Sequence, residues 1–103
     1  SRTRGISLKK VADTQAVIDS VVGYITSTNF KDFPDVVNMV DDATDQLGKI
    51  KDAKAKHEAA AAKKDWEQAN LWAEQVWQYQ VKAADIGLRA KTYLEQNGAK
   101  KVK

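Results

Sequence analysis

The chain has 103 residues, of which 43% are hydrophobic and 30% are charged, and this length suffices for one small domain but not for a second core. It has no cysteine, which excludes disulfides, thiolate zinc sites and cysteine nucleophiles. A net charge of +3 does not by itself indicate nucleic-acid binding, and no apolar run approaches the roughly 20 residues that span a bilayer, so we expect a soluble protein.

The first predicted helix runs from about Ser7, as its N-cap, to about Thr26. Its apolar residues recur at helical spacing: Leu8, Val11, Ile18, Val22 and Ile25, with Val17, Val21 and Tyr24 beside them. The whole chain has only five glycines and one proline, so turn signals are few. This composition favours long helices over a sheet.

The second predicted helix opens at Asp32, whose side chain can cap a helix in which Phe33 and Pro34 take the first positions. Its core-facing residues repeat at a/d spacing: Val36, Val40, Ala43, Leu47 and Ile50. Gly48 either ends this helix or only weakens a helix that continues. Residues 50–63, rich in alanine and lysine, therefore form a third helix or extend the second, with a small face made of Ile50, Ala53 and Ala60.

The last predicted helix begins after Asp65, which resembles a capping box with Gln68, and ends before Asn97-Gly98. Four helical segments joined by short loops predict an all-α fold, either an up-down four-helix bundle or three long helices of which one is kinked. We expect the bundle over residues 7–97. A flexible basic N-terminal tail at 1–6 and a flexible basic C-terminal tail at 98–103 would flank it.

The last helix has apolar residues on two of its sides. One stripe follows strict 3–4 spacing: Trp72, Val76, Tyr79, Ala83, Ile86, Ala90 and Tyr93. The second lies roughly 150° away: Trp66, Trp77, Val81, Ala84 and Leu88. We assign the first stripe to the core, because the first two helices supply matching stripes. The second is either buried in a bundle with this helix at its centre, or it docks on a partner. Four candidate partner-binding residues follow: Trp66, Trp77, Val81 and Leu88.

Polar side chains provide no recognisable catalytic, cofactor or metal site. His57 is the only histidine, and between Lys56 and Glu58 we expect it on the solvated surface. Asp41, Asp42 and Asp45 lack the spacing and glycine of a calcium-binding loop and form a solvated acidic face. There is no glycine-rich phosphate loop and no GxSxG elbow, so we predict that the protein is not an enzyme and holds no cofactor.

Charge is unevenly distributed along the chain. Residues 31–47 contain five aspartates and one lysine, whereas residues 49–64 contain six lysines, one aspartate and one glutamate. The lysines and the basic tails could follow a phosphate backbone, which keeps nucleic-acid binding as an alternative. Against it, the basic helix has no interleaved aromatic residues and no groove-reading motif is visible. The opposed charges favour pairing between helices or with a protein partner.

One stretch resembles a known family. Tyr24-Ile25 ends a helix, and after a short loop Phe33-Pro34-Asp35-Val36-Val37-Asn38 opens the next. This aromatic-Pro-x-Val-x-Asn start, over about residues 15–50, resembles the Trp-Pro-x-Val-x-Asn helix start of the PsbQ-type extrinsic proteins of photosystem II. Phe33 stands where that family usually has tryptophan, and the tryptophan-rich last helix has no obvious counterpart. The resemblance implies a four-helix bundle in the thylakoid lumen that has no catalytic residues and docks on photosystem II.

The sequence therefore predicts a non-catalytic helical accessory subunit that binds a larger protein complex, which is photosystem II if the resemblance holds. A small basic nucleic-acid-binding protein and a homo-oligomeric scaffold are the alternatives.

Overall fold

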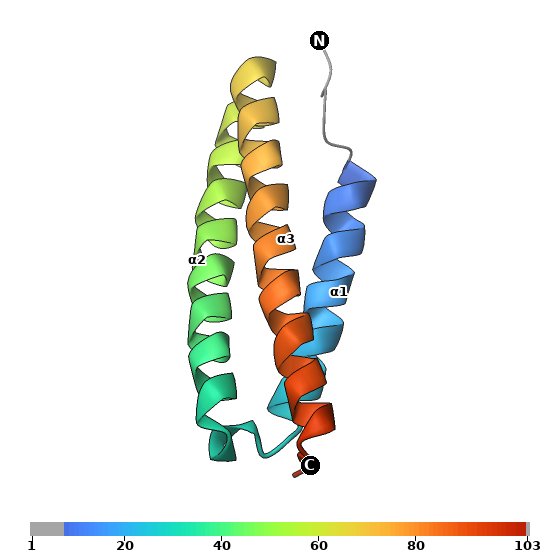
Figure 1. Cartoon of the computed structure of the whole chain (residues 1–103). Coiled ribbons are helices and arrows are strands. Elements are labelled where there is room, and N and C mark those ends of the chain that lie inside the picture. The colour runs from blue at the N-terminus through green and yellow to red at the C-terminus, as the bar shows by residue number, and fades with distance from the viewer. Residues whose placement is uncertain (1–7, 103) are drawn as a thin grey trace.

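The computed structural model describes residues 8–102, which form three α-helices and one short 3-10 helix. In chain order these are α1 (Leu8–Thr26), η1 (Phe30–Asp32), α2 (Pro34–Ala62) and α3 (Trp66–Gln96). Successive α-helices run in opposite directions in a rod 51 Å long and 20 Å across (Figure 1). The all-α class is confirmed, and residues 8–102 contain three α-helices rather than four. Ser7 and the predicted tail at 1–6 lie outside the described residues.

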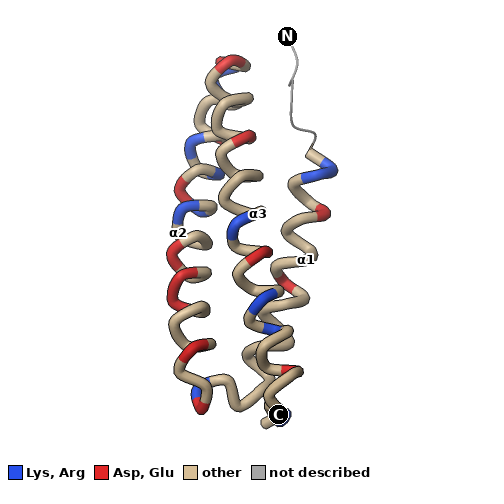
Figure 2. Tube along the Cα trace, viewed as in Figure 1, with Lys and Arg blue, Asp and Glu red and all other residues tan. Residues whose placement is uncertain are grey.

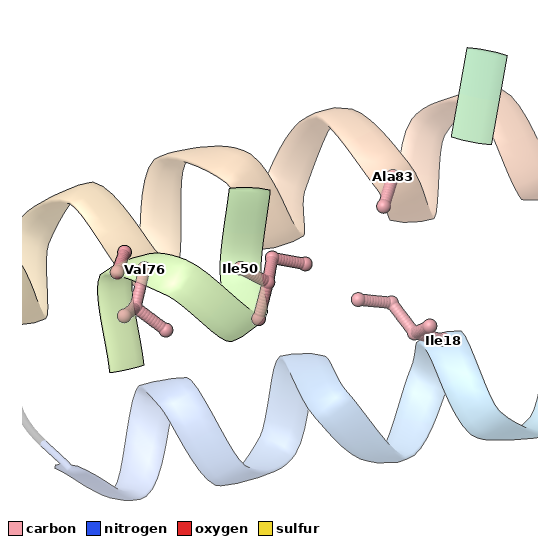
Figure 3. Packing of buried hydrophobic residues seen from close by; sticks show 5 residues of the cluster. Ile18, Ile50, Val76 and Ala83 are labelled. Carbon is pink, nitrogen blue, oxygen red and sulfur yellow. The ribbon is translucent and has the colours of Figure 1, made fainter. Parts of the chain in front are cut away.

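The central helix is α3. It packs along both α1 and α2, whereas α1 and α2 barely touch each other. In Figure 1, α1 and α2 accordingly lie on either side of α3. One core cluster contains Ile18 of α1, Ile50 of α2, and Val76 and Ala83 of α3, whose side chains meet between the helices (Figure 3). A second cluster closes the end of the bundle near η1.

Residues 34–62 form one continuous helix, so the fourth helix of the predicted bundle is not found in the described chain. Gly48 does not interrupt it. Glycine costs about 1 kcal/mol relative to alanine inside a helix, and Leu47 and Ile50 on either side pack into the core. Their burial outweighs the weak helix propensity of Gly48.

The predicted cap at Asp32 is wrong. The N-cap of α2 is Phe33, which makes no side-chain cap bond and whose carbonyl accepts from the backbone N–H groups of Val36 and Val37. Asp32 belongs to η1, where its carboxylate accepts from Asn29 Nδ2 at 3.2 Å. The 3-10 turn moves the helix start one residue further along, with Pro34 at a position where a missing N–H is harmless.

Both predicted ends of α3 are confirmed. The Gln68 N–H donates to Asp65 Oδ1 at 3.3 Å, which caps the first turn. At the other end Asn97 is the C-cap and Gly98 has φ +74°, a conformation that glycine adopts at no steric cost. The chain then turns back, and the Ala99 N–H donates to Leu94 O.

Residues 98–102 of the predicted C-terminal tail contact the α1–η1 connection. The Val102 N–H donates to Ser27 O at 2.8 Å, and the Asn29 N–H donates to Lys100 O at 2.9 Å. The Lys100 N–H in turn donates to the Asn29 side chain at 2.8 Å. These bonds hold the segment to the end of the bundle, although its lysine-rich sequence carries no sign of such pairing.

Gly87 marks a close approach of α3 to α1. A Cβ atom built on it would lie 2.8 Å from Cγ1 of Val21, a buried side chain that is stiff at χ1. We expect Gly87→Ala to lower the free energy of unfolding by about 1 kcal/mol, because overpacking outweighs the better helix propensity of alanine. Gly48→Ala, where the new Cβ meets nothing within 4 Å, should raise it by about 0.5–1 kcal/mol.

Urea unfolding followed by circular dichroism measures both changes. Adding Val21→Ala to Gly87→Ala tests the cause, since removal of the clashing methyl groups should make the two substitutions non-additive. Equal stabilisation by Gly87→Ala and Gly48→Ala would contradict the close contact.

Candidate docking surfaces

The buried line of α3 runs between the two predicted stripes. It follows alternating steps of four and three residues and consists mostly of small side chains: Ala69, Ala73, Val76, Gln80, Ala83, Gly87, Ala90 and Leu94. We call these eight residues the small-residue seam. It shares Val76, Ala83 and Ala90 with the predicted core stripe, whose aromatic members are only partly buried. Small side chains let the neighbouring helices approach, so the bulky ones are moved to the flanks.

The flank that faces α2 carries the aromatic residues of the first stripe. Lys56 Nζ lies 4.6 Å from the Trp72 ring centre, and Lys49 Nζ lies 5.8 Å from that of Tyr79. At the η1 end, the Tyr93 hydroxyl donates to Asp35 at 3.3 Å. These partners on α2 are spaced by multiples of seven residues, and so are their counterparts on α3. Charged side chains of α2 therefore contact the aromatic residues of this flank.

The other flank faces α1 and contains Trp77. Lys10 of α1 lies over the Trp77 ring at 4.9 Å, and Lys91 of α3 lies over Tyr24 of α1 at 5.3 Å. Trp77 is half-buried as a result. Halfway between these two contacts, Val17 on α1 comes opposite Ala84 on α3.

Of the four candidate partner-binding residues, three share one surface. Val81 and Leu88 are 42% and 46% exposed. They follow Trp77 by four and eleven residues, which places them on the same side of α3 as Trp77. Trp66 is 38% exposed but stands at the first turn of α3, beyond the Leu8 end of α1, because Lys10 near that end already lies over Trp77. The structure thus brings Trp77, Val81 and Leu88 together and separates Trp66 from them.

Val17 extends this surface and was missed by the sequence reasoning, which placed it beside the core stripe of the first helix. It is 41% exposed and belongs to the α1 row of Lys10 and Tyr24, which borders the Trp77 flank. We call Val17, Trp77, Val81 and Leu88 the α1/α3 strip. The spacing of seven residues from Lys10 to Val17 to Tyr24 was the available signal.

A second apolar surface was also missed. Because α1 and α2 do not pack on each other, a groove with a volume of about 150 Å³ remains between them above α3. Val22 and Ile25 line one wall, Val40 and Leu47 line the other, and Ala83 lies among the residues beneath them. We call it the α1/α2 groove. It lies on the opposite edge of α1 from Val17, so the strip and the groove are separate surfaces.

His57 is not on the solvated surface as predicted. It is partly buried, and its Nδ1 atom lies 2.8 Å from the carbonyl oxygen of Ala69. The small side chains of α3 leave room for its ring between the two helices. Its position therefore gives it a structural role, as a hydrogen-bonded link between α2 and α3.

Within residues 8–102, no three His, Asp or Glu side chains gather into a group that could hold a metal ion. Asp41, Asp42 and Asp45 are all exposed on α2. None of the described helices is both long enough and apolar enough to cross a membrane.

The two tryptophans named as candidates should differ in their effect on stability. We expect Trp77→Ala to lower the free energy of unfolding by about 2 kcal/mol, because it removes a ring half-buried between α1 and α3. Trp66→Ala, at the exposed first turn of α3, should cost less than about 1 kcal/mol. Urea titration of the two variants measures the difference, and equal losses would mean that Trp66 is as well packed as Trp77.

Comparison with known proteins finds no relative of this chain. No protein-family model matches the chain, and neither a curated protein nor a solved structure matches it.

Proposed function

We propose that this chain is a non-catalytic helical accessory subunit that docks on a larger protein assembly through the α1/α3 strip. The observation that carries the proposal is the exposure of Val81 and Leu88 in one line with the half-buried Trp77, continued onto α1 by Val17. A tryptophan partly covered by its own chain and bordered by exposed aliphatic residues is typical of the anchor of a protein interface.

The charges around the strip favour a protein over a nucleic acid. The lysines nearest to it, Lys10 and Lys91, lie over the rings of Trp77 and Tyr24. In the basic segment at residues 49–64, two of the six lysines, Lys49 and Lys56, likewise lie over aromatic rings of α3. A row that tracks phosphates would instead project its ammonium groups together into solvent.

The resemblance of residues 15–50 to the PsbQ-type proteins motivates a more specific proposal, in which the assembly is photosystem II and the chain acts in the thylakoid lumen. The residues that carry this resemblance lie at the end of α1, Tyr24-Ile25, and at the start of α2, from Phe33 to Asn38, and none of them is a member of the strip. Docking through the strip and binding to photosystem II are therefore independent proposals, and one experiment tests both.

We expect the double substitution Val81→Asp/Leu88→Asp to weaken docking by at least about a hundredfold, because it places two unpaired carboxylates in an apolar interface. Leu71→Asp is the matched control, since Leu71 is 53% exposed on the same helix but lies outside the strip. All three substituted side chains are exposed, so circular dichroism should show unchanged helix content. Co-sedimentation of wild type, double variant and control with photosystem II complexes measures the binding.

Wild-type binding that the double variant loses and the Leu71 variant keeps would support both proposals. If the wild type does not bind, photosystem II is excluded, and the same three proteins are compared for the complexes that co-purify with each. Retention of a co-purifying complex by the double variant would overturn docking through the strip. A wild-type mass of two or more chains in solution, reduced to one by the double substitution, would show instead that the strip joins copies of this chain.

A further inference from the structure

The α1/α2 groove is separate from the strip, and nothing in the described chain fills it. Its lining is almost entirely aliphatic, with Thr26 and Thr44 as the only hydroxyl-bearing residues. Val22 on the α1 wall remains 40% exposed, while Val40 and Leu47 on the α2 wall are half-buried. The residues beneath them are small, because Ala83, Gly87 and Ala90 belong to the seam of α3. An elongated apolar body could lie here in contact with all three helices.

Within the stretches of α1 and α2 that line the groove, the charged residues are all acidic. From Val11 to Thr26 the charged residues of α1 are Asp13 and Asp19, and from Pro34 to Gly48 those of α2 are four aspartates. Figure 2 shows this acidic half of α2, with its basic residues confined to the half further from η1. Asp19 is one turn from Val22, and Asp41 is one turn from Thr44, so both carboxylates border the opening. An occupant must therefore be apolar on one side and positively charged along its edges.

We propose that the α1/α2 groove binds an amphipathic helix of another protein, whose apolar face lies between α1 and α2 and whose basic flanks pair with Asp19 and Asp41. A helix satisfies its own backbone hydrogen bonds, so it can enter a groove that offers almost no polar partners. The acidic borders repel the carboxylate or phosphate of a lipid. A second copy of this chain is a poor occupant through α2, because the apolar row of its basic half, Ile50, Ala53 and Ala60, is buried in its own core.

The test is an NMR titration of the isotope-labelled full chain with a synthetic helical peptide of leucine and lysine. A length of about 14 residues gives four turns with one leucine face. The matched control peptide has glutamate in place of every lysine. We expect the lysine peptide to shift the signals of Ala83, Gly87 and Val40, which line the groove. We expect the glutamate peptide to bind at least about tenfold more weakly, and the affinity of the lysine peptide to fall as salt is added.

Two sets of variants separate the groove from other surfaces. Val22→Arg/Thr44→Arg places cations on both exposed walls and should weaken binding of the lysine peptide at least about tenfold. Asp19→Asn/Asp41→Asn leaves the shape of the walls unchanged and should reduce both the affinity and its salt dependence. Val81→Arg is the matched control on the strip and should leave peptide binding unchanged.

Peptide-induced shifts confined to Val17, Val81 and Leu88, or equal affinity for the two peptides, would overturn the proposal. The proposal would also be overturned if the wild-type chain were a dimer and the Val22→Arg/Thr44→Arg variant a monomer, since a second copy would then cover the groove. These outcomes concern the groove alone, so loss of docking through the strip leaves this proposal standing, and failure of the groove leaves the strip standing.

Discussion

The continuous burial of small side chains along α3 is the constraint on which the rest of this structure depends. Alanine and glycine at the seam provide little apolar surface of their own, but they bring the backbones of α1 and α2 close to that of α3. At Gly87 the approach leaves no space for a methyl group beside Val21. The larger side chains of α1 and α2, such as Ile18, Val21 and Ile50, then fill the space between the helices. Stability depends on this close fit rather than on a wide hydrophobic core.

A seam of small residues also decides where the aromatic residues lie. Trp72, Tyr79 and Trp77 flank the seam, where lysines of the neighbouring helices cover their rings. At the seam itself one polar residue is buried: the amide of Gln80 is fully enclosed and donates to Gln15 of α1 at 3.0 Å. Polar pairs of this kind fix the register of packed helices. Close packing on α3 leaves α1 and α2 apart, and this separation creates both the groove between them and the exposed outer edge of α1.

Local signals in the sequence were sufficient for much of the fold. The cap at Asp65 and the Asn97-Gly98 pair gave both ends of α3, and the small face of Ile50, Ala53 and Ala60 was identified as a packing surface. The core line of α3 was only partly predicted, because hydrophobic bulk points to Trp72 and Tyr79 while the buried residues beside them are alanine and glycine. Tertiary packing determined the rest. Continuity of α2 through Gly48, burial of His57 beside Ala69 and the pairing of Lys100 with Asn29 all depend on contacts between distant segments.

Only part of the candidate site could be predicted, because the spacing along one helix does not determine where its neighbours lie. Spacing on one helix identified Trp77, Val81 and Leu88, since steps of four and seven residues place them on one side of α3. It could not separate Trp66 from them or add Val17, because both require the relative position of α1 and α3. The α1/α2 groove exists only because two helices fail to pack on each other, and no single helix records that in its sequence.

The most direct test of this account is the solvent exposure of individual methyl groups in the isolated chain. With a water-soluble paramagnetic agent, NMR signals of Val22, Val81 and Leu88 should broaden strongly. Those of Ala83, Ala90 and Leu94, which belong to the small-residue seam, should remain sharp. This result would establish α3 as the central helix with two apolar surfaces open to partners. Protection of Val22, Val81 and Leu88 to the same degree as the seam would contradict it, because both proposed docking surfaces would then be covered.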